Sequence, residues 1–186
     1  MKVTKKGNGM EALKRAIREV KSKQLRVGWG ADIKYTDDKG GEGERVAVIA
    51  AQNEFGNPAK NIPPRPFMRP TVNANKTKWM TTAAKGISLA LRDQRSIADV
   101  MDAIGQLAAG DIRKTISKIT SPALSPTTIE LRRRRRNGEK ITGKTVGEAY
   151  KAASSAFFQA GSSSESKPLV ETGYMLNSLS SEVVNK

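Results

Sequence analysis

The sequence predicts an α+β fold, in which a small antiparallel sheet packs on one long helix, with shorter helices and a mobile basic insertion around it. The long helix is predicted by apolar residues that recur at helical spacing in a nearly unbroken stripe from Ile97 to Ile119. About 23 residues at ~1.5 Å each would span roughly 35 Å. The sheet is predicted by two segments. Apolar and other residues alternate over 25–29, and the C-terminal residues 179–184 suit an edge strand.

The segments before the long helix carry their own local signals. Asn8 and Glu11 have the spacing of a capping box, which predicts an amphipathic helix over 9–22 that packs on the sheet. The apolar side chains of this helix recur at helical spacing: Met10, Leu13, Ile17 and Val20. Residues 33–35 are expected to continue the first strand or to pair with it, and residues 37–44 to form a turn-rich acidic loop.

The most informative segment is 53–70, which holds five of the eight prolines of the chain. Each proline fixes φ near about −65° and removes a backbone donor, and the residue before each proline is kept out of the helical region. We therefore expect residues 57–70 to form a stiff, extended connector that presents an aromatic residue, a methionine and two arginines in a fixed geometry. A helix is expected to follow over 71–92, and Ser96 is expected to cap the long helix.

Beyond the long helix the chain becomes strongly basic and then polar. Ser125 followed by Pro126 resembles an N-cap with proline at the first helical position, which predicts a short, very basic helix over 127–135. Residues 137–167 are rich in Gly, Ser, Lys and Ala and are expected to form a flexible insertion. A short helix is expected within it, over 149–160.

The length of 186 residues suits one domain with an appendage. We expect a core α+β domain over 1–136 that includes the connector 57–70. The flexible basic insertion 137–167 follows it. Residues 168–186 are expected to return to the core as a short helix, beginning at Thr172, and a strand.

The composition limits both the chemistry and the partners of the chain. Its 33 Lys and Arg against 18 Asp and Glu give a net charge of +15, which attracts polyanions such as nucleic acid, an acidic protein face or an anionic membrane. The absence of Cys and His excludes disulfides, zinc sites of the usual Cys/His kind and histidine-dependent catalysis. No apolar run approaches the roughly twenty residues that a transmembrane helix needs. Aromatic residues are too few to stack single-stranded bases, so any contact with nucleic acid is expected at the phosphate backbone.

Three motifs, in order along the chain, suggest a family. The first is Glu54-Phe55-Gly56, a short loop, and then Ile62-Pro63-Pro64-Arg65-Pro66-Phe67-Met68-Arg69-Pro70. The second is Ser125-Pro126-Thr127-Thr128-Ile129 followed by arginines. The third is Lys167-Pro168-Leu169-Val170-Glu171-Thr172-Gly173-Tyr174-Met175-Leu176-Asn177-Ser178-Leu179. Over residues 46–184 the chain resembles the tail-completion or neck (head–tail joining) proteins of tailed bacteriophages, which are related to virion-morphogenesis and minor tail proteins. Residues 137–166 depart from that pattern as an insertion.

The resemblance implies a structural virion protein at the head-proximal end of the tail, which helps to join the tail to the capsid as a closed ring, a hexamer. The implied partners are other copies of the chain and the neighbouring tail terminator, tail tube or head-connector proteins, with non-specific contact with genomic DNA. No enzymatic activity, cofactor, membrane or small-molecule substrate is implied. The implied place is the virion neck, after assembly in the host cytoplasm. The resemblance also favours a short helix over 45–55, where the residues alone leave strand and helix open, with Gly56 at its C′ position.

Two groups of residues are candidates for contact with partners. The first group lies in the connector, which is expected to set the angle between the sheet and the long helix and to dock on a neighbouring subunit through Arg65, Phe67, Met68 and Arg69. The second group is a basic run that is expected to contact DNA phosphates or an acidic partner: Arg132, Arg133, Arg134, Arg135 and Arg136. Adjacent like charges cost helix stability, which favours a partner over a solvated helix face. The alternative function is that of a basic protein that binds nucleic acid without sequence preference.

The carboxylates do not predict an active site. Asp37, Asp38, Glu42 and Glu44 crowd a glycine-rich loop, but their spacing does not match a calcium-binding EF-hand loop. We expect a solvated hairpin tip. Glu54 has no acidic or basic partner near it in sequence, which argues against a general base there. No catalytic, cofactor-binding or metal-binding residue is expected.

Overall fold

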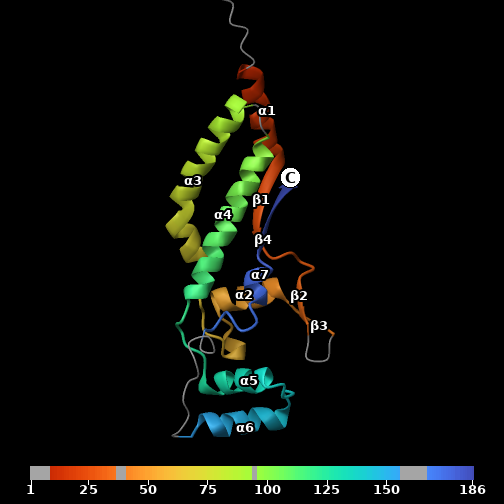
Figure 1. Ribbon diagram of the computed structural model, residues 1–186, viewed down its shortest axis with the longest axis vertical. Helices are drawn as coiled ribbons and strands as arrows, with labels where there is room; N and C mark the ends of the chain where they lie inside the picture. Colours follow the sequence, from red (N-terminus) through yellow and green to blue (C-terminus); the bar gives the residue numbers. More distant parts are fainter. Residues whose placement is uncertain (1–8, 37–40, 94–95, 156–166) are drawn as a thin grey trace, which may run out of the picture. The chain divides into compact units, whose positions relative to one another are not determined.

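The computed structural model describes residues 9–36, 41–93, 96–155 and 167–186. Helices and two small antiparallel sheets make up the regular structure, so the predicted α+β class is confirmed (Figure 1). The chain divides into two compact units. The first unit comprises Met1–Gly28, Pro70–Ile112 and Leu179–Lys186, and the second comprises Trp29–Arg69 and Arg113–Ser178.

The described residues of the first unit form two strands and three helices. They are α1 (Gly9–Ser22), β1 (Lys23–Gly28), most of α3 (Met68–Asp93), most of α4 (Ile97–Lys118) and β4 (Ser180–Asn185). Strands β1 and β4 pair antiparallel along their whole length. The predictions of the N-terminal helix, the first strand, the long helix and the C-terminal edge strand are confirmed. The expected cap Asn8 lies outside the described residues.

The sheet of β1 and β4 packs on α4, as predicted, and Gly105 permits the close approach. A Cβ atom at Gly105 would lie 2.6 Å from Ser181 Cβ and 2.7 Å from Leu25 Cδ1. Real side-chain contacts do not come so close, so only a residue without a Cβ fits between this helix and the sheet.

The N-terminus of α4 is capped from two directions. Ser96 Oγ accepts a hydrogen bond from the Ala98 N–H at 3.1 Å, which confirms the predicted cap. The carboxylate of Glu19, on α1, accepts from the Ile97 N–H at 2.9 Å. A negative charge is favourable at a helix N-terminus, so Glu19 ties α1 to the start of α4.

Helices α3 and α4 lie side by side within the first unit (Figure 1). Their polar tie is Asp111 of α4, which accepts from Trp79 Nε1 at 2.8 Å and pairs with Lys78 Nζ at 3.1 Å. Their apolar contact is a small cluster of alanine and branched or long aliphatic side chains: Ala16, Ala90 and Ile97, with Ile87, Leu91, Val100 and Met101 packed around them.

The apolar face of α1 is exposed, which corrects the prediction that this helix packs on the sheet through its apolar stripe. Met10, Leu13, Ile17 and Val20 are between 42 and 64% exposed. Among the described residues of α1, only Ala16 is buried. The helical period showed correctly which side chains share a face, but not whether that face is covered.

The second unit contains a β-hairpin and several short helices. They are β2 (Lys34–Thr36), β3 (Glu42–Arg45), α2 (Val46–Phe55), the 3-10 helix η1 (Pro58–Lys60), α5 (Pro126–Arg136), α6 (Gly143–Ala153) and α7 (Tyr174–Asn177). Strand β2 pairs with β3 and not with β1, because the chain turns back on itself and the Val46 N–H donates to Ile33 O at 3.0 Å. The helix implied over 45–55 is present as α2. It is followed by Gly56 at φ 79°, a conformation that favours glycine.

The connector is shorter than predicted. The main chains of Asn57 and Ile62 exchange two hydrogen bonds, of 2.8 and 2.9 Å, which close a small loop around η1. Helix α3 then begins at Met68, three residues before the expected start. Within the connector, only residues 63–67 lie outside any helix, turn or bridge. The prediction of an extended chain over 57–70 is therefore wrong at both ends.

Helix α6 begins six residues before the helix predicted over 149–160. The Thr145 N–H donates to Thr142 Oγ1 at 3.3 Å, and the Thr142 N–H donates to Thr145 Oγ1 at 2.7 Å. This reciprocal cap sets the start of α6 at Gly143. Part of the segment expected to be flexible is therefore helical, and the remainder of the predicted helix, 156–160, lies outside the described residues.

Candidate functional site

The carboxylate of Glu54 holds the start of α3. Its Oε2 accepts from the N–H groups of Phe67, at 2.6 Å, and Met68, at 2.8 Å. Its Oε1 accepts from the Arg69 N–H at 3.1 Å and from Arg69 Nε at 2.9 Å. Pro70 follows and has no N–H to satisfy, so it fits the first turn of a helix. These contacts explain why α3 begins before Pro70, and they fix the connector to α2.

Glu54 is 4% exposed, yet its surroundings favour the ionised form. Burial alone would raise the pKa of this carboxyl group. The N–H groups of Met68 and Phe67, together with Arg69, outweigh burial and hold the pKa below its usual range. The carboxylate therefore accepts from four donors in this structure, and the absence of a catalytic role for Glu54 stays a prediction.

Two of the connector residues predicted to dock on a neighbour turn inward, and this corrects their assignment. Phe67 is 1% exposed and meets Trp29 edge to face, with ring centroids 5.9 Å apart. Arg65 is 5% exposed, and its guanidinium donates to the carbonyl oxygens of Pro122, at 2.8 Å, and Ala123, at 3.2 Å. Neither side chain offers surface to a flat neighbouring face, because each is enclosed by its own chain.

Met68 and Arg69 differ from these two residues. Met68 is partly buried and Arg69 is exposed. The Arg69 guanidinium lies over the Phe55 ring, 4.8 Å from its centroid, and Phe55 itself is 65% exposed. Contact with a neighbouring subunit through Met68 and Arg69 stays a prediction, and Phe55 is a neighbour that the sequence did not single out.

The first arginine of the basic run is structural. Arg132 is 8% exposed. It donates to the carbonyl oxygens of Lys167, at 2.7 Å, and Pro168, at 2.9 Å, and its Nε lies 3.1 Å from Glu171 Oε2. Burial lowers the pKa of this guanidinium, and Glu171 opposes the change. A partner surface cannot reach Arg132, so its assignment to DNA or an acidic partner is corrected.

The next arginines pair with carboxylates of the same unit. Arg134 contacts Glu130 at 3.0 Å, Glu148 at 3.1 Å and Glu139 at 3.3 Å, and so joins α5 to α6. Arg133 pairs with the buried Glu130 at 2.7 Å. Arg135 pairs with Glu171 at 3.2 Å. The run is therefore an ion-pair network rather than a freely solvated face. A further contact of Arg133, Arg134, Arg135 or Arg136 with a polyanion stays a prediction.

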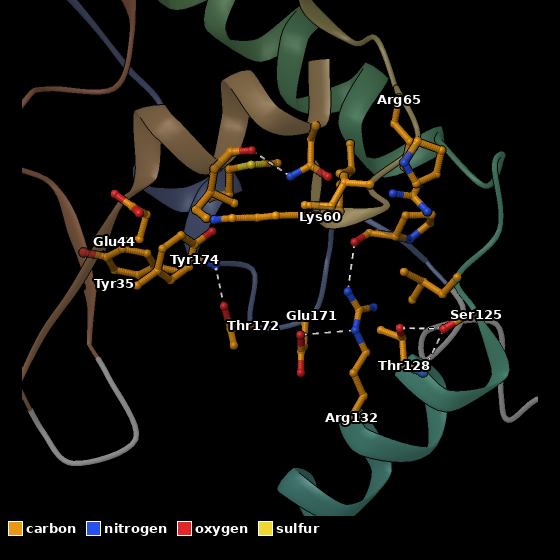
Figure 2. A pocket seen from close by; sticks show the side chains of 18 of the residues that line it. Tyr35, Glu44, Lys60, Arg65, Ser125, Thr128, Arg132, Glu171, Thr172 and Tyr174 are labelled. Atoms are coloured by element: carbon orange, nitrogen blue, oxygen red, sulfur yellow. Dashed lines mark hydrogen bonds and ion pairs between the residues drawn. The ribbon is translucent and has the colours of Figure 1, made fainter. Parts of the chain in front are cut away.

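A pocket of about 870 Å³ opens in the second unit between these two candidate groups. Figure 2 shows Lys60, Arg65 and Arg132 reaching into it, with Tyr35 and Tyr174 together on one side. The two tyrosine rings are 5.2 Å apart. Burial raises the pKa of Tyr35, and the neighbouring Tyr174 and Glu171 raise it further.

The described residues hold no group of acidic side chains placed to bind a metal. In the predicted acidic loop, Glu42 pairs with Lys34, which lowers the pKa of Glu42. Asp37 and Asp38 lie outside the described residues. Within the described part of the chain, no helix is both long and apolar enough to cross a membrane.

Sequence reasoning missed three features of this region: the capping role of Glu54, the burial of Arg65 and the pairing of the arginines with Glu130 and Glu171. A signal for the first was present, because Glu54 and the Phe-Met-Arg-Pro sequence belong to the same motif. The pairs with Glu130 also had a local signal, since Arg133 and Arg134 follow it by three and four residues. No local pattern pointed to the burial of Arg65 or to the pair of Arg135 with Glu171, whose contacts join residues 57 and 36 positions apart. Comparison of the chain with protein-family models, with curated proteins and with solved structures found no match.

Proposed function

We propose that this chain is a structural virion protein of a tailed bacteriophage, a tail-completion or neck component that helps to join the tail to the capsid as a ring of identical subunits. The ring would stand at the head-proximal end of the tail. Its other faces would meet the tail terminator, the tail tube or a head-connector protein. The chain would act through its surfaces, without catalysis.

Contacts among the three motifs that carry the family resemblance support the proposal. Glu54 of the first motif caps the helix that begins with the last residues of that motif. Arg65 of the first motif binds Pro122 and Ala123, directly before the second motif. Arg132, after the second motif, binds Lys167 and Pro168 of the third. The motifs therefore form one connected structure, as residues of a shared family pattern are expected to do.

The single structural observation that carries the ring assembly is the exposed apolar face of α1. Four aliphatic side chains on one side of a helix remain largely in solvent: Met10, Leu13, Ile17 and Val20. Covering them would contribute on the order of several kcal/mol. A monomer gains nothing from this arrangement, whereas a second copy of the chain that packs on α1 does.

Light scattering of purified protein tests the assembly. We expect a mass that rises with concentration to that of a closed oligomer. Ile17→Glu places a charge in the apolar face and should leave a monomer. The control is Met80→Glu on α3, since Met80 is also highly exposed but lies on another helix. A wild-type chain that stays monomeric at every concentration would refute the proposal.

An electrophoretic shift of duplex DNA at increasing salt separates the proposal from the nucleic-acid-binding alternative. That alternative predicts tight, salt-sensitive binding by a monomer. Because Arg132, Arg133, Arg134 and Arg135 already have carboxylate partners, we expect weak binding. Tight binding of DNA without any oligomer would favour the alternative.

A further inference from the structure

Arg65 is a buried cation with no counter-ion among the residues that the structure describes. Its two hydrogen-bond acceptors are neutral backbone carbonyls. No carboxylate among the described residues pairs with it. Burial lowers the pKa of Arg65, and the like charge of Arg132 lowers it further. A buried, uncompensated charge is costly, so an anion that reaches Arg65 would be bound favourably.

The surroundings of Arg65 do not supply that anion. The charged residues that line the pocket are Lys60, Arg65, Arg132 and Arg135 against Glu44 and Glu171. Glu171 is already shared between Arg132 and Arg135. Lys60 is exposed and has no carboxylate partner among the described residues. The pocket therefore has an excess of positive charge, with Arg65 and Lys60 as its uncompensated members (Figure 2).

The rest of the lining combines apolar and aromatic residues with uncharged polar ones such as Asn53 and Thr128, and this mixture suits a polypeptide. Ile49, Ile62, Leu124, Leu169 and Met175 contribute to the walls, and the paired rings of Tyr35 and Tyr174 also line the pocket. Concave sites of this volume with a few polar groups at fixed positions are typical of specific ligand sites.

We propose that this pocket binds an acidic segment of a partner protein, with one carboxylate at Arg65, another at Lys60 and apolar side chains against the walls. A DNA duplex fits less well, because its phosphates lie on a convex surface and Arg65 is only 5% exposed. Arginine also suits this chemistry, because its planar fork matches a carboxylate. The inference goes beyond the proposed ring assembly and depends only on the residues that line this pocket.

Fluorescence anisotropy with the full chain tests the inference. The probe is a fluorescein-labelled short peptide of alternating glutamate and leucine, and its matched twin carries glutamine in place of glutamate. We expect the glutamate peptide to bind about tenfold more tightly than its twin. Lys60→Gln should weaken binding about three- to fivefold, as for a partly solvated ion pair.

Lys151→Gln on α6 is the matched control, since Lys151 is also exposed but does not line the pocket. It removes the same charge and should leave binding unchanged. Arg65→Gln should weaken binding more than Lys60→Gln does, and its thermal unfolding shows whether the unit is intact. Because the Lys60 side chain has no hydrogen bond or ion pair with another described residue, its variant decides the question even if Arg65→Gln is unstable.

Three results would overturn the inference. Equal binding of the two peptides would show that carboxylates are not recognised. Equal weakening by Lys60→Gln and Lys151→Gln would indicate diffuse attraction to a basic protein. An unlabelled DNA duplex that displaces the peptide, and whose own binding Lys60→Gln weakens to the same degree, would assign the pocket to nucleic-acid phosphates.

Discussion

The two units of this chain bury different kinds of side chain. In the first unit the buried hydrophobic side chains are small or aliphatic: Ala16, Ala90, Ile97, Ala108, Ala109, Ile112 and Leu179. The second unit buries apolar side chains too. In addition it holds every buried charged residue found in the described part of the chain: Glu54, Arg65, Glu130 and Arg132. Removing one partner of a buried charge is strongly destabilising. The second unit therefore depends on its internal pairs, whereas the first depends on close packing.

The comparison extends to the surfaces. The first unit leaves the apolar face of α1 in solvent, while the second encloses Phe67 in the connector. From the sequence we expected the opposite: an apolar face of α1 packed on the sheet, and Phe67 in contact with a neighbouring subunit. Periodicity identifies the members of a face, and proline identifies a constrained backbone, but neither shows what lies opposite. Each unit also has its own tryptophan, Trp79 in the first and Trp29 in the second, so the two can be followed separately.

Phe67→Ala should have the largest effect. Loss of a fully buried phenylalanine costs about 3–5 kcal/mol in the free energy of unfolding, here measured for the second unit. Ile17→Ala, at an exposed position, should change the stability of the first unit by less than about 0.5 kcal/mol. Urea unfolding followed by the emission of Trp29 or of Trp79, in single-tryptophan variants, gives the two values. Similar costs at both positions would mean that the comparison is wrong.

Glu54→Gln should destabilise the second unit by about 2–3 kcal/mol at neutral pH, because charge-assisted hydrogen bonds to a buried carboxylate are lost. The folded-state pKa of Glu54 is lowered, so its contribution is fully present above the unfolded value of about 4.3. It is lost as the pH falls through the folded pKa. Unfolding curves of the wild type and the variant should therefore converge at acid pH.

The control for Glu54 is Glu182→Gln, since the side chain of Glu182 is 63% exposed. It should show little effect at any pH. A difference between wild type and Glu54→Gln that stays constant from neutral to acid pH would contradict the capping role of the ionised carboxylate.

Gly105→Ala sharpens the account of the first unit. The added Cβ would meet Ser181 and Leu25, and overpacking of this kind costs about 1–3 kcal/mol. Gly110→Ala, on the same helix, meets nothing within 4 Å and should stabilise the unit by up to about 1 kcal/mol. Thermal unfolding monitored by Trp79 measures both. Equal effects at the two glycines would show that the sheet does not approach α4 so closely.

Arg134→Gln should have the smallest effect, below about 1 kcal/mol, since its pairs with Glu139 and Glu148 are partly solvated, and Arg133 remains paired with the buried Glu130. High salt screens such pairs, so added salt should reduce the difference between variant and wild type. Helix content measured by circular dichroism across a salt series checks this. An effect that grows with salt would rule out an ion-pair role.

The fold was predictable wherever a signal is local. The limits of α1, the long helix and the C-terminal strand followed from periodicity and capping residues such as Ser96. Most contacts of the candidate site were not predictable, because they join segments that are distant in the sequence. The burial of Arg65 depends on Pro122 and Ala123, and the role of Arg132 depends on Glu171. The spacing of three and four residues could have indicated the pairs of Arg133 and Arg134 with Glu130, but no local pattern shows that Glu171 lies next to Arg132 in space.

The proposed covering of α1 by another copy of the chain can be measured directly, because the chain has no cysteine of its own. In Ile17→Cys, the rate of thiol labelling reports whether position 17 is covered, and Met80→Cys serves as the exposed reference. We predict fast labelling of both in dilute protein and a marked, selective slowing at position 17 as the concentration rises. The same fast rate at position 17 at every concentration, in protein that scatters light as a monomer, would contradict the account.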